Sequence, residues 1–285
     1  MQTRREFLGG TTAAAASLAF SKPAFAAAVA DSAIGVQLYT VRSEIIAEPA
    51  RVLAAIRKIG YQTVETFAAQ YTRPAAELRG LILDAGLTLP SAHYSYADFD
   101  SKFDYAKELG ATDVVCGAEP SNLAVSADAF KRFAEQYNKW GERAQKMGMR
   151  FGFHNHNFEF QTFDGRTGLD ILLAETDPKL VWWQMDCYWV TQGGQDPLAL
   201  MRRYHNRLQT LHFKDRKPGV EVSTVPGKTS QHFTEIGAGT LDFPAIWKYA
   251  SSIGIKYFFV EQDTTEMPPL ESLAISYRNI KRLLV

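Results

Sequence analysis

The sequence predicts a single α/β domain, a (β/α)8 TIM barrel, over residues 27–285. Eight short apolar runs alternate with eight amphipathic stretches, and strands that alternate with helices pair in a parallel sheet. The composition does not change within this range, so neither a linker nor a second domain is expected. Many of the apolar runs end in a polar residue, which is typical of strands at the active face of such a barrel.

The first half of the predicted barrel contains four strand–helix pairs. The strands are expected at 33–38, 63–67, 87–93 and 113–116, and the helices at 43–59, 74–85, 101–109 and 126–147. In the longest helix, aromatic residues recur every three or four positions, which indicates one apolar face: Phe130, Phe133, Tyr137 and Trp140. A glycine follows each of the four helices, as is common at helix C-termini: Gly60, Gly86, Gly110 and Gly148.

A doubly wound open sheet is the competing interpretation of these first elements. In its dinucleotide-binding form it would need a glycine-rich turn after the first strand. This chain has Tyr39-Thr-Val-Arg42 at that place, which is not such a turn. The closed barrel is therefore favoured.

The second half begins with Phe151-Gly-Phe-His-Asn-His-Asn-Phe-Glu159, an apolar strand that ends in histidines, asparagines and a glutamate. Strands are expected at 149–153, 180–186, 208–213 and 257–261, and helices at 168–175, 197–204, 242–252 and 270–284. Asp242 and Pro244 suit the start of the helix at 242–252. Residues 215–242 show neither a helical nor a strand period, so we expect a long loop over the active face.

The first 26 residues predict a twin-arginine (Tat) signal peptide rather than a part of the fold. Arg4-Arg5 precedes the apolar pair Phe7-Leu8, and an alanine-rich region then leads to the cleavage pattern Ala24-Phe-Ala26. The segment predicts recognition by the Tat export machinery and a periplasmic protein. The apolar region is too short and too weakly apolar for a permanent membrane span.

Composition and charge limit the kinds of partner. The chain has 31 basic and 31 acidic residues, and without residues 1–26 it would have 28 and 30. Proteins that bind nucleic acids usually carry a basic excess or stripe, so no nucleic-acid partner is expected. The two cysteines, Cys116 and Cys187, are too few for a disulfide framework, and we expect free thiols. The sequence leaves the formation of a homo-oligomer open.

Histidines and acidic residues mark the ends of six predicted strands. They are Glu65, His93, His154, His156, Asp186, His212 and Glu261. The C-terminal ends of the strands of a closed barrel meet at one rim, so we expect these side chains to converge. Imidazoles mixed with carboxylates suit a divalent ion such as Mn²⁺, Co²⁺, Zn²⁺ or Mg²⁺. Aromatic residues gather at the same rim, where they either stack on sugar rings or pack beneath loops: Tyr39, Phe67, Tyr94, Tyr96, Phe158, Tyr188 and Trp189.

Six motifs follow one another along the chain: Gly60-Tyr-Gln-Thr-Val-Glu65, His154-Asn-His156, Met185-Asp186, His212-Phe-Lys-Asp215, Glu235-Ile-Gly-Ala-Gly-Thr-Leu-Asp-Phe243 and Val260-Glu261. In this order they resemble the sugar phosphate isomerase/epimerase family, the xylose-isomerase-like barrel group. The group also includes tagatose 3-epimerase, inosose dehydratase and endonuclease IV relatives. The resemblance covers essentially all of residues 27–285.

The resemblance implies a metal site in which strands five to eight supply Glu, Asp, His and Glu. Asp186, His212 and Glu261 match this pattern by position. His154 stands where the family more often has a glutamate, so the fourth ligand stays open. It is His154 or His156, because imidazole binds Mn, Co and Zn well, or it is Glu159, which could supply the missing carboxylate.

The implied chemistry is proton transfer next to a carbonyl group. A metal that bridges a carbonyl and a neighbouring hydroxyl acidifies the intervening C–H bond, and a carboxylate or histidine moves the proton. We assign Glu261 as ligand and base, and His156 or Glu159 as the second acid/base. Substrate oxygens are expected to bind to four further residues: Gln37, Glu65, His93 and Lys214.

Several functions compete within this interpretation. The first hypothesis is an isomerase or epimerase that acts on a keto-sugar or keto-polyol. A lyase or hydrolase on 3-keto-glycosides, or an inosose-type dehydratase, follows, because His154 breaks the usual glutamate pair. A sugar-binding barrel without catalysis is the third hypothesis. An apurinic endonuclease is opposed by the balanced charge and by the export signal.

Overall fold

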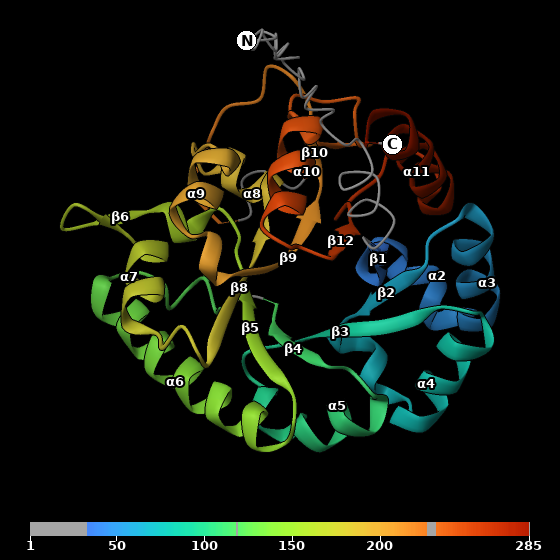
Figure 1. Ribbon diagram of the computed structural model, residues 1–285, viewed down its shortest axis with the longest axis horizontal. Coiled ribbons are helices and arrows are strands. Elements are labelled where there is room, and N and C mark those ends of the chain that lie inside the picture. Colours follow the sequence, from blue (N-terminus) through green and yellow to red (C-terminus); the bar gives the residue numbers. More distant parts are fainter. Residues whose placement is uncertain (1–32, 118, 227–231, 285) are drawn as a thin grey trace, which may run out of the picture.

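The barrel predicted from the sequence is confirmed in the computed structural model, which describes residues 33–117, 119–226 and 232–284. Eight parallel strands form a closed barrel in the order β1-β12-β9-β8-β5-β4-β3-β2 (Figure 1). Their bounds are β1 Ala33–Gln37, β2 Thr63–Thr66, β3 Thr88–Tyr94, β4 Asp113–Cys116, β5 Arg150–His154, β8 Val181–Asp186, β9 Leu208–Phe213 and β12 Tyr257–Val260. The predicted signal peptide, residues 1–26, lies outside the described residues.

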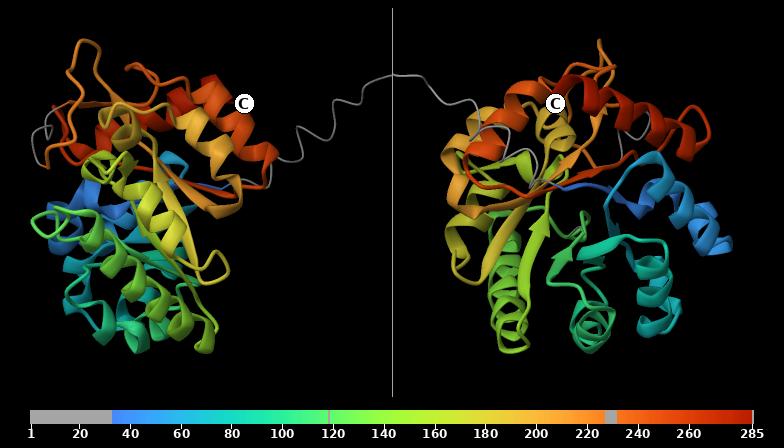
Figure 2. Two further views of the ribbon diagram at one scale, coloured as in Figure 1. Left: turned by 90° about the vertical axis from the view of Figure 1, so that its left-hand side faces the viewer. Right: turned by 45° about the vertical axis from the view of Figure 1, so that its right-hand side comes forward.

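Helices surround the strands on the outside, as Figures 1 and 2 show. The main ones are α3 Pro49–Ile59, α4 Ala75–Asp84, α5 Phe103–Leu109, α6 Ala127–Lys146, α7 Gly168–Glu175, α9 Pro197–Arg203, α10 Phe243–Ser252 and α11 Pro269–Leu284. The apolar stripe predicted for the longest helix is confirmed, because Phe130, Tyr137 and Trp140 of α6 are buried. The side chain of Ser126 caps this helix by accepting a hydrogen bond from the backbone N–H of Ala129.

Two predicted elements differ from the observed ones. The helix expected over 43–59 is divided into α2 Arg42–Ala47 and α3, because Pro49 has no backbone N–H and forces Glu48 out of the helical region (φ −135°, ψ 63°). The connection expected to lack strands contains a short antiparallel pair, β10 Asp215–Arg216 and β11 Phe233–Thr234.

Three further short elements were not predicted. The helix α8 Cys187–Gln192 begins directly after β8, and the side chain of Asp186 caps it by accepting from the N–H of Trp189. Strands β6 Thr162–Phe163 and β7 Arg166–Thr167 form a two-stranded hairpin after β5. Elements this short carry too few residues for a period to be recognised in the sequence.

Parallel register sets which side chains meet at the C-terminal rim. Gln37 of β1 lies beside Glu65 of β2, and His154 of β5 lies beside Gln184 of β8. Asp186 of β8 lies beside His212 of β9. Because neighbours in register share a level of the barrel, polar residues from distant segments form one layer.

The remaining sequence predictions about the described residues concern cysteines and membrane helices. Cys116 and Cys187 are both buried and form no disulfide, as predicted. Within the described ranges, none of the helices combines the length and the apolarity that a membrane crossing requires.

Candidate active site

Four side chains from neighbouring strands meet at the C-terminal rim of the barrel. His154, Asp186, His212 and Glu261 each place one nitrogen or oxygen within 4.8 Å of those of the other three. All four residues are buried. Asp186, His212 and Glu261 are the ligands that the resemblance implied, and the structure groups them with His154, one of the three candidates for the fourth position.

His212 lies at the centre of this group, between two carboxylates. Its Nδ1 is 2.8 Å from Glu261 Oε2, and its Nε2 is 2.6 Å from Glu65 Oε2. Burial alone would lower the pKa of His212, but Glu65 and Glu261 raise it to about 9. Burial would likewise raise the pKa of Glu65, but His93 and His212 lower it well below its usual value. In the absence of a metal, the imidazolium of His212 therefore bridges two ionised carboxylates and offsets one of their two charges.

Glu65 is the most heavily hydrogen-bonded carboxylate of the site. It accepts from Gln37 Nε2 at 2.9 Å, from Ser91 Oγ at 2.5 Å and from Gln184 Nε2 at 2.8 Å. Its side chain is fully buried, and it does not line the cavities described below. The structure therefore places Glu65 beneath the site, where it orients His212, whereas the sequence predicted that it binds substrate.

Gln184 was missed in the sequence, although it orients two of the histidines. Its Oε1 is 2.6 Å from His93 Nε2 and 3.2 Å from His154 Nδ1. An amide oxygen only accepts, so both of these nitrogens carry a proton. The other nitrogen of His154, Nε2, keeps its lone pair and lies 3.6 Å from Asp186 Oδ2. Gln184 precedes Asp186 by two residues, so the strand period could have identified it.

Lys214 is buried among carboxylates rather than exposed on a loop. Its Nζ lies 2.8 Å from Glu261 Oε2, 2.8 Å from Asp263 Oδ1 and 3.2 Å from Asp186 Oδ2. Burial would lower the pKa of Lys214, but Asp186, Asp263 and Glu261 raise it well above the ordinary value. Asp263 was not identified from the sequence, because it lies in the loop after β12 and outside any strand pattern.

His156 and Glu159, the two candidates for the second acid/base, point to different places. His156 lines the cavity, and its buried Nδ1 has no hydrogen-bond partner within the described ranges. Burial, followed by the charge of Lys214, lowers the pKa of His156 to about 3, so the ring is neutral. Glu159 is fully buried, and both of its oxygens accept from the backbone N–H of His156 at 3.0 Å. The structure thus brings His156 to the cavity and places Glu159 behind it.

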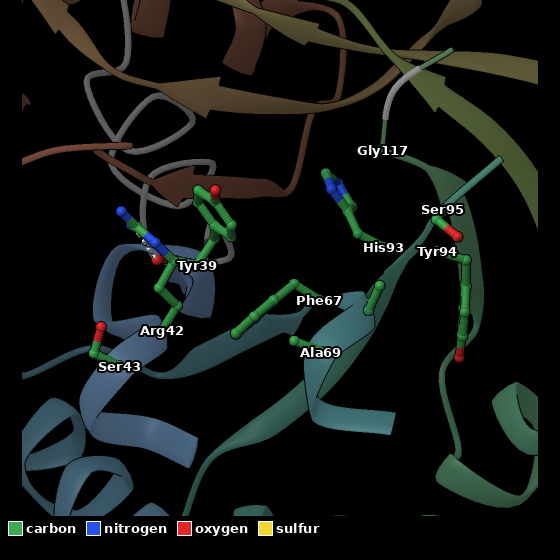
Figure 3. A pocket seen from close by; sticks show the side chains of 10 residues that line it. Tyr39, Arg42, Ser43, Phe67, Ala69, His93, Tyr94, Ser95 and Gly117 are labelled. Atoms are coloured by element: carbon green, nitrogen blue, oxygen red, sulfur yellow. Dashed lines mark hydrogen bonds between the residues drawn. The ribbon is translucent and has the colours of Figure 1, made fainter. Parts of the chain in front are cut away.

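Two connected cavities open above these residues. We call the first the polar pit; it has a volume of about 180 Å³ and is lined by Gln37, Tyr39, Phe67, His93, Gly117, His154, His156, Lys214, Glu261 and Asp263. We call the second the aromatic chamber; it has a volume of about 590 Å³ and is lined by Tyr39, Arg42, Ser43, Phe67, Ala68, Ala69, His93, Tyr94, Ser95 and Gly117 (Figure 3). The predicted substrate-binding residues Gln37, His93 and Lys214 all line the pit.

The four grouped side chains fit a divalent metal ion. They offer two imidazole nitrogens and two carboxylates, a donor set that suits Mn²⁺, Co²⁺ or Zn²⁺ better than Mg²⁺. Asp186 Oδ2 is buried without a well-formed hydrogen bond to the described residues, and such an atom is expected to have a partner. His154 Nε2 faces the same oxygen with its lone pair.

Comparisons with known proteins agree with the fold. Residues 53–283 match the family model described as xylose isomerase-like TIM barrel. The chain is 30% identical over 155 residues to an inosose dehydratase of Lacticaseibacillus casei, and this match covers 50% of the chain and 51% of that protein. The match therefore spans about half the length of this relative.

Two solved structures show the same fold. A sugar phosphate isomerase/epimerase from Parabacteroides distasonis superposes with a TM-score of 0.73 at 24% identity, over 88% of this chain and 96% of that one. A protein described as IOLI with a binding zinc atom superposes with a TM-score of 0.69 at 12% identity, over 88% and 98%. At these identities the likeness establishes the architecture alone.

Proposed function

The chain belongs to the xylose isomerase-like TIM barrel family, and we propose that it is a metal-dependent isomerase or epimerase that removes a proton next to the carbonyl group of a keto-sugar or keto-polyol. One observation carries this proposal. The donor atoms of His154, Asp186, His212 and Glu261 lie within 4.8 Å of one another, and the pit above them also holds a buried lysine, Lys214. His154 and Glu261 of this group line the same small polar cavity as Lys214, which supports a cation site, a base and a proton donor acting on one substrate.

The metal would be held by His154, Asp186, His212 and Glu261. When bound, a divalent ion supplies Lewis-acid polarisation of the substrate carbonyl and so lowers the pKa of the neighbouring C–H bond. The zinc-bound structural relative and the donor set support a divalent ion of the Mn, Co or Zn type. His212 must lose its proton to serve as a ligand, so binding of the metal releases a proton.

Glu261 is the proposed base. Burial would raise the pKa of Glu261, but Lys214 and His212 lower it to about 2, so the carboxylate is ionised at neutral pH and can accept a proton. Lys214 Nζ, 2.8 Å from the same carboxylate, is a donor for the oxygen on which negative charge develops. Neutral His156 lies on the lining of the same pit and serves as the second acid/base.

Two outcomes follow from the same first step. If the proton returns to the other face or to the neighbouring carbon, the enzyme is an epimerase or an isomerase. If instead the C–O bond on the next carbon breaks, its electron pair leaves with the oxygen, a C=C bond forms, and Lys214, which is protonated, supplies the proton to the leaving oxygen. This lyase is the second candidate. It is supported by the position of Glu159 outside the pit, where this carboxylate cannot pair with Glu261 across a substrate, and by relatives that are named inosose dehydratase.

Proton exchange tests the proposal directly. The purified protein is freed of metal with a chelator, restored with Mn²⁺, Co²⁺ or Zn²⁺, and incubated in D₂O with a panel of keto-sugars and keto-inositols. We expect metal-dependent deuterium incorporation at the carbon next to the carbonyl, detected by mass spectrometry. Glu261→Gln should reduce this exchange by at least about 10²-fold, since general acid–base catalysis contributes about 10²–10⁴-fold. Absence of exchange with every substrate in the restored protein would contradict the proposal.

We also propose, from the sequence of residues 1–26, that the protein is exported by the Tat machinery to the periplasm. The twin arginine and the small-residue cleavage pattern support this proposal. Cell fractionation of the full chain should place it in the periplasm, and replacement of Arg4 and Arg5 by lysine should retain it in the cytoplasm. Equal distribution of both forms would argue against export by this route.

A further inference from the structure

The aromatic chamber is joined to the polar pit and differs from it in chemistry. Both cavities are lined by Tyr39, Phe67, His93 and Gly117, so these residues form the boundary between the two cavities. A Cβ atom at Gly117 would lie 3.1 Å from His93 Nδ1, so a side chain at this position would narrow the space at that boundary. In Figure 3 the rings of Tyr39 and His93 lie on opposite sides of the open space.

The volumes of the two cavities indicate more than one ring in the substrate. The pit, at about 180 Å³, holds roughly six water volumes of ~30 Å³, which suits one sugar ring with its hydroxyls. The chamber, at about 590 Å³, falls in the range of 300–1,000 Å³ that is common for small-molecule pockets. A single keto-sugar would occupy the pit and leave the chamber to water.

The chamber presents a fixed aromatic edge. The rings of Tyr39 and Phe67 meet edge to face, with centroids 5.5 Å apart and planes at 88°. The backbone N–H of Tyr39 donates to Gln37 Oε1 at 3.2 Å, and Arg42 donates to the Tyr39 carbonyl at 3.1 Å. Arg42 also donates to the carbonyl of Asp263 at 2.8 Å, and its guanidinium covers the Tyr39 ring at 4.5 Å. Tyr39 is 38% exposed although it is held from both sides, so part of it remains available to a ligand.

The rest of the chamber is small and uncharged. Ala68 and Ala69, in the 3-10 helix Ala68–Thr72, are exposed on its wall, and Ser43 and Ser95 add hydroxyl groups. No carboxylate and no lysine belongs to the lining formed by the described residues. The lining does include the guanidinium of Arg42, but this group already donates hydrogen bonds to two backbone carbonyls. These surfaces suit a ring with one apolar face and a few hydroxyl groups. They suit a phosphate group less well.

We propose that the aromatic chamber binds a second ring, so that the substrate is a keto-glycoside rather than a free keto-sugar. This inference rests on the proposed function, because the keto-sugar ring must occupy the pit. The second ring, whether an aromatic group or another sugar, stacks beside Tyr39 and Phe67. A smaller hollow of about 270 Å³ continues from the chamber past Ala68, Tyr94 and Ser95, and gives a longer substituent a way out.

Binding of ligands that cannot enolise tests the chamber separately from the chemistry. Calorimetry with the metal-restored protein compares methyl β-glucoside, phenyl β-glucoside and methyl β-cellobioside, none of which has a ketone. We expect at least one of the two ring-extended ligands to bind about fivefold or more tightly than methyl β-glucoside. The phenyl and cellobioside arms then distinguish an aromatic from a sugar occupant.

Filling the chamber should remove this preference. Ala69→Trp, with Ala68→Phe as a second variant, is expected to reduce the advantage of the ring-extended ligand below about twofold and to leave the affinity for methyl β-glucoside unchanged. Ala76→Trp, on the exposed face of α4 and away from both cavities, is the matched control and should behave like the wild type. Thermal melting verifies that each variant is folded.

Three results would overturn the chamber assignment: equal affinities for the three glucosides, no binding of any of them, or a preference that survives in both filled variants. Failure of the proposed function would look different. A protein that prefers ring-extended glucosides but exchanges no proton with any keto-sugar would keep the chamber and lose the chemistry. One that exchanges protons with free keto-sugars and shows no ring preference would lose the chamber alone.

Discussion

Two groups of fully buried carboxylates in this molecule differ in the partners that surround them. At the centre of the barrel, Glu65 and Glu261 lie against His212 and Lys214, and their pKa values are lowered. Behind the loop that follows β5, Glu119 and Glu159 interact with each other, and burial is the first cause that raises the pKa of both. Depth alone therefore does not decide whether a carboxylate is ionised; the nearest charge does.

The second group is completed by Tyr137, whose hydroxyl donates to Glu119 Oε1 at 2.5 Å. Glu119 Oε2 lacks a donor among the described residues, and two ionised carboxylates would offer none to each other. A proton shared between Glu119 and Glu159 supplies the missing donor. Because Glu159 accepts from the N–H of His156, this acid pair positions the loop that carries His156.

The largest effect on stability is expected when Lys214 is removed from among the central carboxylates. Lys214→Met leaves the buried carboxylates of Asp186 and Glu261, and the partly exposed one of Asp263, without the ammonium group, so the free energy of unfolding of the metal-free protein should fall by about 3–5 kcal/mol. Urea denaturation at pH 7 measures this change. Lys217→Met, which removes a solvent-exposed pairing with Glu266, is the control and should cost at most about 1 kcal/mol. Similar losses in the two variants would refute the view that buried charge distinguishes this group.

A bound metal ion should stabilise the protein through the four-residue group at the centre and not through the acid pair Glu119 and Glu159. At a concentration about a hundredfold above its Kd, Mn²⁺ or Zn²⁺ should raise the free energy of unfolding of the wild type by about 2.7 kcal/mol. Asp186→Asn should abolish most of this gain, and Glu119→Gln should retain it, because only Asp186 belongs to the four-residue group. Denaturation with and without metal measures both. Retention of the full gain in Asp186→Asn would place the ion elsewhere.

The smallest effect is expected at the acid pair and depends on pH. Above the ordinary pKa of 4.5, the unfolded chain has lost protons that the folded chain keeps on Glu119 and Glu159, so stability falls as the pH rises through this window. Glu119→Gln keeps an acceptor for Tyr137 and gives Glu159 a donor. It should therefore gain about 1 kcal/mol relative to the wild type at pH 8, which is the usual net contribution of one hydrogen bond, and little at pH 4.

Thermal and urea unfolding between pH 4 and pH 8 check this prediction. Glu175→Gln, an exposed glutamate at the end of α7, provides the control and should show no such pH dependence. If the advantage of Glu119→Gln were constant across the pH range, packing rather than the shared proton would be its cause.

Periodicity and strand endings predicted most of the fold and the members of the candidate metal site. Asp186 and His212 end consecutive strands of the barrel, and parallel strands end on one side, so their meeting follows from topology. The division of the helix at Pro49 was within reach of the sequence, because proline and the residue before it have restricted backbone angles. Gln184 was within reach as well, two positions before Asp186 on the same face.

The directions of side chains outside the strands were beyond such an argument. Glu159 follows His156 by three residues, but its carboxyl group turns away from the pit. There it accepts hydrogen bonds from the backbone N–H of His156 and interacts with the carboxyl group of Glu119. From the sequence, Lys214 could equally have been exposed to solvent. Inside the barrel it is held by Asp186, by Glu261 and by Asp263, which lies 49 residues further along the chain.

By itself, the sequence determined the eightfold alternation and the polar residues at the ends of the strands, because local period and strand direction are written in neighbouring residues. Only the tertiary structure decided which carboxylates are ionised, which histidine nitrogen stays unprotonated and where the cavities lie. These properties depend on groups brought together across the barrel. Glu65 and His212, for example, are 147 residues apart in the sequence, but Glu65 Oε2 lies 2.6 Å from His212 Nε2. Electrostatic interaction depends on that distance in space and not on separation along the chain.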